Sequence, residues 1–143
     1  MKYEKILLFL FLISVILFGC AGASLKDYEA KSLEEEEIKT LLNAYESAWN
    51  EHNSSRFLAL LHEKFVIWAG NERRIVYTKK KYAFMLRDRM REYRVLRLGK
   101  PAIWIKDDKA TVFLPMSVDG RNIRNEFYLI RMNGKWFFLS SEF

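Results

Sequence analysis

Few side chains in this sequence are arranged for acid–base, nucleophilic or metal chemistry. The chain has two histidines and a single cysteine. His62 could act as a general base, because imidazole titrates near neutral pH, or it could complement the negative end of a helix dipole. Arg124 and Glu126 could form a catalytic pair or a plain ion pair on one strand face. Neither histidine stands at a metal-binding spacing from other ligands. We therefore expect no catalytic residue, no metal and no cofactor.

Asn125 is the better candidate for contact with a ligand. It is an uncharged polar residue on the apolar face of a strand expected over residues 121–132. A buried amide must be hydrogen-bonded, and its partner could be a ligand, Tyr45, a backbone group or water. Tyr45, Trp49 and Trp136 would be walls of the same pocket, or ordinary core aromatics. The pocket candidates are therefore Tyr45, Trp49, His62, Asn125 and Trp136.

Cys20 stands at the end of an apolar N-terminal segment. Lys2 and Lys5 precede an apolar run over residues 6–18, which is interrupted only by Ser14. This run is shorter than the roughly 20 residues that a transmembrane helix needs. A basic start, a short apolar run and small residues after it are typical of a secretory signal peptide.

The segment Leu17-Phe18-Gly19-Cys20 resembles the lipobox of bacterial lipoproteins. The resemblance implies that the Cys20 thiol is lipidated, that residues 1–19 are removed, and that the protein is anchored to a membrane facing the periplasm. Ala21, in place of aspartate, implies the outer membrane under the sorting rule of this class. A buried thiol or a leftover cysteine is the alternative. Residues 20–32 would hold the lipidated cysteine and a flexible tether, and residues 33–143 one domain.

The charge of the chain is concentrated in one region. The formal net charge is +6, and the stretch from Glu72 to Lys100 contains eleven basic residues and three acidic ones. The helix expected after Thr78 therefore forms a basic ridge. An anionic envelope component is a possible partner for it, and a solvated face explains the same charges. Export through a signal peptide argues against nucleic acid as a partner.

Periodicity and turn signals predict an α+β domain. Ser32 can cap a helix that continues to about residue 51, and Ser54 or Ser55 can cap a second helix containing Phe57 and Leu61. Asp107-Asp108, Asp119-Gly120 and Asn133-Gly134 are turn signals. The expected strands cover residues 64–70, 94–106, 109–118, 121–132 and 135–142.

Counting outward from these turns assigns the two faces of the expected sheet. One face is almost wholly apolar and should pack on the helices. The opposite face carries Trp104, Phe113, Tyr128 and Leu139, which is more apolar than a solvated face needs to be. We expect a homodimer through these four residues.

Two segments resemble the nuclear transport factor 2-like superfamily in its SnoaL-like and ketosteroid isomerase-like branches. They are "LLNAYESAWNEHNSSRFLALLHEKFVIW" and "NEFYLIRMNGKWFFLSSEF". The resemblance implies a cone, in which a curved antiparallel sheet wraps three N-terminal helices around a cavity. Enzymes of this family place Asp or His in that cavity, and the apolar face here has neither. We therefore expect a non-catalytic domain that binds a ligand or partner. The alternative is a small SnoaL-like isomerase or dehydratase acting on an apolar or cyclic substrate.

Overall fold

The computed structural model describes residues 23–69 and 74–142, so Cys20 and the expected signal peptide lie outside the described residues. The helical elements are η1 (Leu25–Asp27), α2 (Leu33–Asn50), α3 (Ser54–Leu58) and α4 (Lys79–Glu92). The strands are β1 (Leu61–Ala69), β2 (Arg74–Thr78), β3 (Leu96–Leu98), β4 (Ala102–Lys106), β5 (Lys109–Val118), β6 (Arg121–Met132) and β7 (Lys135–Glu142).

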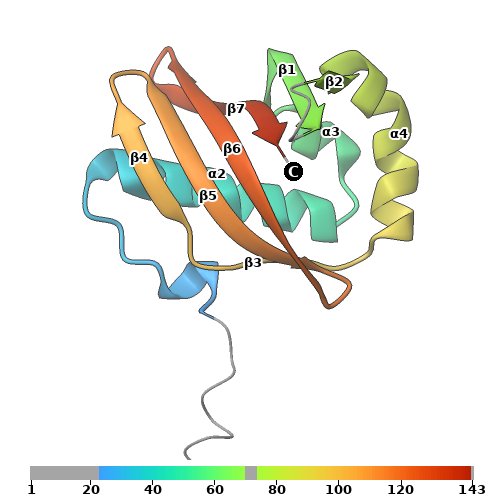
Figure 1. Cartoon of the computed structure of the whole chain (residues 1–143), viewed down its shortest axis with the longest axis horizontal. Coiled ribbons are helices and arrows are strands. Elements are labelled where there is room, and N and C mark those ends of the chain that lie inside the picture. Colours follow the sequence, from blue (N-terminus) through green and yellow to red (C-terminus); the bar gives the residue numbers. More distant parts are fainter. Residues whose placement is uncertain (1–22, 70–73, 143) are drawn as a thin grey trace, which may run out of the picture.

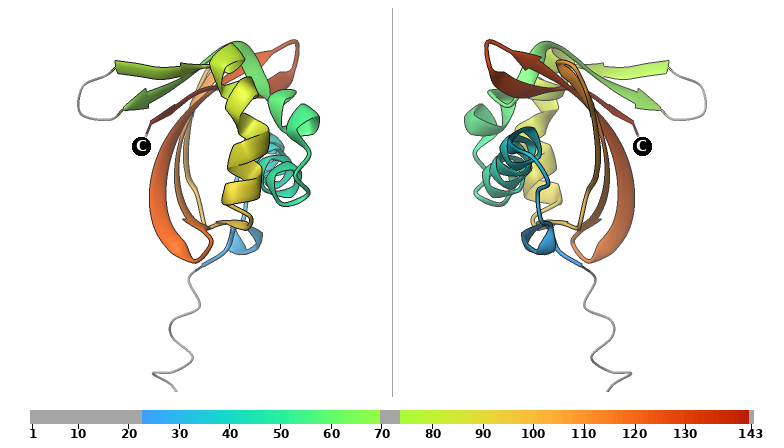
Figure 2. Two further views of the ribbon diagram at one scale, coloured as in Figure 1. Left: turned by 90° about the vertical axis from the view of Figure 1, so that its right-hand side faces the viewer. Right: turned by 90° about the vertical axis from the view of Figure 1, so that its left-hand side faces the viewer.

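These strands form one seven-stranded sheet that curves around the helices (Figure 1). The strand order is β2-β1-β7-β6-β5-β3, and β4 also pairs with β5. β1 runs parallel to β7, while the other paired strands are antiparallel, so the sheet is mixed and not antiparallel throughout as expected. Seen from the side, the sheet bends over α2 and α4, and the β1–β2 pair projects from one end (Figure 2). The α+β class and the cone are confirmed.

Side-chain caps fix where the helices begin. The Ser32 hydroxyl accepts from the Glu35 amide, as expected, and the Thr78 side chain caps α4. The cap of α3 is Asn53, whose side chain accepts from the Arg56 amide, and not Ser54 or Ser55. Asn, Asp, Ser and Thr all serve this role, because a short side-chain oxygen reaches an unpaired N–H of the first turn. The sequence therefore predicts where the first helix ends and the second begins, but not which residue caps the second helix.

The expected hairpins of the meander are present. Asp119 and Asn133 have φ values of 49° and 50°, and the glycine after each also has positive φ, which suits the two-residue turns. The strand expected over 94–106 is divided into β3 and β4 around Gly99. A Cβ at Gly99 would lie 2.8 Å from the carbonyl oxygen of Pro115, so only glycine permits this close approach.

Two parts of the sheet were not expected. β2 was not predicted, and β1 begins at Leu61, in a stretch that the sequence assigned to the second helix. The Leu61 side chain is buried, and Leu61 pairs with Phe138 of β7. Tertiary pairing with a strand more than 70 residues away thus overrides the local helical pattern.

The helix-facing side of the sheet carries the core. The fully or nearly fully buried residues include Ile38, Leu42, Phe57, Leu86, Val112, Leu114, Phe127, Leu129 and Phe138. Among the described residues, this core forms one cluster, which extends from Leu25 to Phe138. We therefore expect residues 21–143, which contain this cluster, to fold as an independent unit.

Counting alternate residues outward from the turns assigns the wrong sheet face at one point, in β7. β7 has an extra residue, Leu139, because Leu129 pairs with Phe138 while Tyr128 pairs with Ser140. This bulge shifts the alternation by one residue. Ser141, which regular alternation from Leu139 would place on the opposite face, pairs with Phe127 and lies on the helix-facing side.

The segment before α2, which the sequence predicts as a flexible tether, is packed against the domain from Ala23 onward. Leu25 and Tyr28 are buried. The Tyr28 hydroxyl donates to Glu35, and the Lys39 ammonium donates to the Tyr28 carbonyl oxygen. Within residues 23–69 and 74–142, no helix is both long and apolar enough to cross a membrane.

Candidate functional site

The inner side of the cone contains a cavity of about 550 Å³. α2, α3 and α4 form one side of it, and the curved sheet forms the other. The lining residues are Tyr45, Trp49, Phe57, Leu61, Phe65, Ile67, Val76, Tyr77, Tyr82, Arg89, Tyr93, Leu96, Met116, Val118, Arg121, Ile123, Asn125 and Ser141. Its size and its mostly apolar lining with a few polar groups are those of small-molecule sites in proteins.

Phe57 is the centre of the aromatic wall. It is 1% exposed. The centre of its ring lies 4.6 Å from that of Tyr45, 5.6 Å from Trp49 and 6.4 Å from Tyr82. Tilted and edge-on contacts of this kind are favourable for aromatic rings. Residues from three helices thus form one rigid surface of the cavity.

Asn125 brings an unpaired acceptor to this cavity. Its Oδ1 atom is buried and has no hydrogen-bond partner among the described residues. Its Nδ2 atom donates only to the Met116 sulfur, at 3.8 Å. Because an unpaired buried acceptor is destabilising, this carbonyl group is suited to a donor supplied from inside the cavity.

Two tyrosines of the lining, Tyr45 and Tyr82, are neutral at physiological pH. Burial raises the pKa of Tyr45 well above its ordinary value, and the nearby Tyr82 phenol adds to this shift. Burial also raises the pKa of Tyr82 to about 12. Both phenols therefore keep their protons at neutral pH and can donate hydrogen bonds, but they are poor bases.

Two arginines in the lining were not predicted from the sequence. Burial by itself would lower the pKa of Arg89, but a hydrogen bond with Tyr77 and neighbouring groups raise it overall. The Arg89 guanidinium also lies 5.9 Å from the centre of the Tyr93 ring. Arg121 follows the β5–β6 turn and is exposed. A seven-residue spacing from Tyr82 could have placed Arg89 on the cavity side of α4, whereas no local signal marks Arg121.

The turn that carries Arg121 is held against the end of α4. The Asp119 carboxylate accepts hydrogen bonds from the Val95 amide at 2.8 Å and from the Arg94 amide at 3.3 Å. The Trp49 indole donates to the Tyr93 carbonyl oxygen at 2.8 Å. These contacts fix the β5–β6 turn and the end of α4 relative to each other.

The free edge of β3 is satisfied by side chains of α2. The Asn50 side chain exchanges two hydrogen bonds with the Leu96 backbone, each 2.8 Å long. The Glu46 carboxylate accepts from the Leu98 amide at 2.8 Å. Side chains of a helix thus take the place of a neighbouring strand, and they hold Leu96 in the cavity wall.

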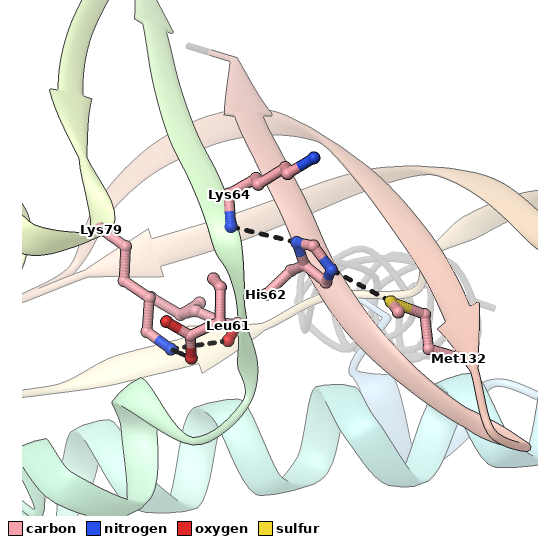
Figure 3. A network of polar contacts seen from close by, with 6 residues as sticks. Leu61, His62, Lys64, Lys79 and Met132 are labelled. Atoms are coloured by element: carbon pink, nitrogen blue, oxygen red, sulfur yellow. Dashed lines mark hydrogen bonds and ion pairs between the residues drawn. The ribbon is translucent and has the colours of Figure 1, made fainter.

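Three of the five predicted pocket residues, Tyr45, Trp49 and Asn125, line the cavity, and His62 and Trp136 do not. His62 lies on β1, not near a helix end as expected, and its Nε2 atom is 3.0 Å from the Met132 sulfur (Figure 3). Its Nδ1 atom accepts from the Lys64 amide. The buried Trp136 donates its indole N–H to Glu37. Both expectations are corrected because these two side chains have partners outside the cavity.

The pair suggested for catalysis lies elsewhere. Arg124 and Glu126 border a second hollow, of about 580 Å³, together with Phe113. Glu126 accepts a hydrogen bond from the Tyr128 hydroxyl at 2.7 Å. Among the described residues, no group of three or more His, Cys, Asp or Glu side chains could hold a metal ion.

No protein-family model and no curated protein matches this chain. Solved structures do match it. An NTF2-like protein from Cytophaga hutchinsonii ATCC 33406 is 14% identical, with a TM-score of 0.65 over 78% of this chain and 97% of that one. A protein of unknown function with a cystatin-like fold, from Nostoc punctiforme PCC 73102, is 16% identical, with a TM-score of 0.62 over 80% and 92%. A protein provisionally named a scytalone dehydratase, from Novosphingobium aromaticivorans DSM 12444, is 14% identical, with a TM-score of 0.57 over 77% and 82%. Such low identities establish the fold alone.

Proposed function

We propose that this domain, which has the nuclear transport factor 2-like fold, binds a small and mostly apolar ligand in its cavity without catalysing a reaction. The observation that carries the proposal is the 550 Å³ cavity, with its aromatic wall and the unpaired Asn125 oxygen. An apolar ligand removes the cavity surface from water, and a single well-placed polar group gives orientation.

The lining favours binding over proton transfer. Among the described residues, no Asp, Glu or His borders the cavity. Tyr45 and Tyr82 stay protonated at neutral pH because burial raises the pKa of both phenols. A general base needs a pKa near the working pH, and neither of these two phenols offers one.

A SnoaL-like isomerase or dehydratase is the second candidate function. One similar solved structure carries a dehydratase name. Such an enzyme would act on an apolar or cyclic substrate and would need an acid–base group in the cavity. Turnover that is lost on Tyr82→Phe and kept on Tyr128→Phe would favour this candidate over simple binding.

The proposal includes lipid anchoring through Cys20. A short apolar run after two lysines, followed by Leu17-Phe18-Gly19-Cys20, supports export and acylation of the thiol. Ala21 supports the outer membrane as the final location. The domain would then bind its ligand in the periplasm.

The ligand itself is the direct test. The full chain, purified from the envelope of the cells that make it and examined by native mass spectrometry, should carry a small molecule that is released on unfolding. The same preparation with Tyr45→Trp, which adds bulk to the cavity wall, should carry less of it. Protein that holds no small molecule and binds no apolar probe would contradict the proposal.

Asn125→Leu separates a ligand-binding role of the amide from a structural one. The substitution removes a buried oxygen without a partner, so we expect the free energy of unfolding to stay the same or rise by roughly 1 kcal/mol. The retained ligand should be lost. Urea unfolding and mass spectrometry measure the two effects. Asn122→Leu, at an exposed site on the same strand, is the control. A loss of about 2 kcal/mol or more at Asn125 would mean a structural role.

A homodimer through the outer sheet face is a second part of the proposal. Trp104 and Phe113 are 58% and 46% exposed, and their rings pack edge to face with centres 5.4 Å apart. Tyr128 is also exposed and Leu139 is half-buried. Exposed aromatic clusters of this kind are typical of protein interfaces.

Phe113→Glu tests the dimer. The charge would be buried without a partner at the centre of this face, so we expect a dimer to become a monomer in sedimentation velocity. Phe84→Glu, at an 80% exposed position on α4, should leave the dimer intact. A dimer with a dissociation constant of about 1 μM would be mostly assembled at a protein concentration of about 50 μM. Residues 21–143 without substitution that remain monomeric at this concentration would therefore contradict the dimer.

The basic side of α4 is the proposed contact with an anionic envelope component. Lys80, Phe84, Arg87 and Arg91 are exposed at helical spacing, so they share one stripe. Cationic side chains beside an exposed aromatic ring suit a surface of anionic headgroups.

A further inference from the structure

We infer that the cavity selects amphipathic anions, which are ligands with an apolar body and one negatively charged head group, through Arg89 and Arg121. The inference rests on the proposed function, because it names the class of ligand that the same cavity binds. The apolar side chains of the strands give no preference for a charged ligand. The two arginines supply a preference for a negatively charged one.

The charges of the lining have a single sign. Arg89 and Arg121 are cationic, and no described carboxylate lines the cavity. Neither arginine forms an ion pair within the described residues, whereas Arg56, Lys79 and Arg131 pair with glutamates. An anion entering the cavity would therefore meet two cations that are not neutralised by direct contact.

Arg89 is also held in a fixed position. Its side chain is half-buried, it hydrogen-bonds to Tyr77, and its guanidinium lies against the Tyr93 ring. Because neither Tyr77 nor Tyr93 is a carboxylate, the Arg89 guanidinium keeps N–H groups that can donate to an anion. A partly buried site strengthens the attraction between these opposite charges. The Tyr93 carbonyl is in turn bonded to Trp49. The cation is thus pre-positioned and does not need to be ordered on binding.

The polarity of the cavity is graded. The buried residues Phe57, Leu61 and Phe65 form an apolar interior, while Arg121 is exposed and Arg89 is half-buried. An apolar body therefore fits inside, with the charge toward the more exposed arginines. A ligand body with an N–H or O–H group that reaches the unpaired Asn125 oxygen would gain a further hydrogen bond.

Two fluorescent probes isolate the charge. 8-Anilinonaphthalene-1-sulfonate has an apolar body, one N–H donor and one anionic group, and N-phenyl-1-naphthylamine is the same body without the sulfonate. Both are titrated into residues 21–143. We expect both to bind, and Arg89→Gln and Arg121→Gln each to weaken the sulfonate about tenfold, as expected for a charged hydrogen bond. Binding of the neutral probe should change less than about twofold.

The control is Arg97→Gln, which removes the same charge from an exposed site of β3 outside the lining. It should leave the binding of both probes unchanged. Equal weakening by Arg97→Gln, equal weakening of the neutral probe, or no effect of either lining substitution would overturn the inference, while the proposed function stands. Absence of binding by both probes would contradict the proposed function itself. Circular dichroism of each variant shows whether it has folded.

Discussion

Cys20→Ser is expected to abolish lipid anchoring, so that no mature protein is found in the membrane fraction. Serine has no thiol to acylate, so neither lipid attachment nor the linked cleavage can follow, and the protein should be soluble in the periplasm or remain unprocessed. Stable anchoring needs more than one acyl chain, so loss of the acylation site should give an all-or-none effect. Fractionation and intact-mass measurement of the released chain give the result.

Ala21→Asp is the matched control for this experiment. It keeps the thiol and the lipid but places aspartate after the cysteine, so the protein should stay membrane-bound and move to the inner membrane. If Cys20→Ser protein still requires detergent and has its mature mass, the cysteine does not carry the anchor. If Ala21→Asp leaves the outer-membrane location unchanged, the sorting rule does not apply here.

Phe57→Ala is expected to give the largest loss of stability among the cavity residues. Phe57 is 1% exposed and packs on Tyr45, Trp49 and Tyr82. Its removal leaves a hole that the wall can only partly fill, and comparable substitutions cost about 3–5 kcal/mol. Urea unfolding followed by tryptophan fluorescence measures this difference.

Phe84→Ala removes the same side chain from an exposed site. Phe84 is 80% exposed on α4, so the change in the free energy of unfolding should stay within about 0.5 kcal/mol. A similar cost at the two positions would show that the aromatic wall is not the rigid part of the cavity. A small cost at Phe57 alone would show that the neighbouring rings collapse into the space.

Local signals in the sequence predicted much of the fold. The dipeptides Asp119-Gly120 and Asn133-Gly134 mark turns because both residues of each take positive φ. Strands grow outward from such turns with fixed alternation, so the core face of the meander follows from counting. The nuclear transport factor 2-like fold, expected from two segments, is confirmed by the solved structures that match the chain.

The remaining features depend on contacts between distant residues. The parallel pairing of β1 with β7 brings Leu61 next to Phe138, and no turn signal in the sequence predicts this pairing. The bulge at Leu139 moves Ser141 into the cavity wall, and no glycine in the local sequence marks the position of the bulge. Arg121 lies in the lining next to a turn that Asp119 holds against Val95, which is 24 residues away from Asp119 in the sequence. For the same reason, sequence alone could propose Tyr45, Trp49 and Asn125 but could not exclude His62 and Trp136.

The packed segment before α2 limits how far this domain can move. Ala23 is bound to the domain through its carbonyl oxygen, which accepts from the Lys100 amide at 3.1 Å, and Ser24 bridges to Gly99. Only two residues separate Ala23 from Cys20 in the sequence. Three trans peptide steps span at most about 11 Å. A domain acylated at Cys20 would therefore lie directly against the headgroup layer of its own leaflet, so molecules that it captures must come from that leaflet or reach it by diffusion.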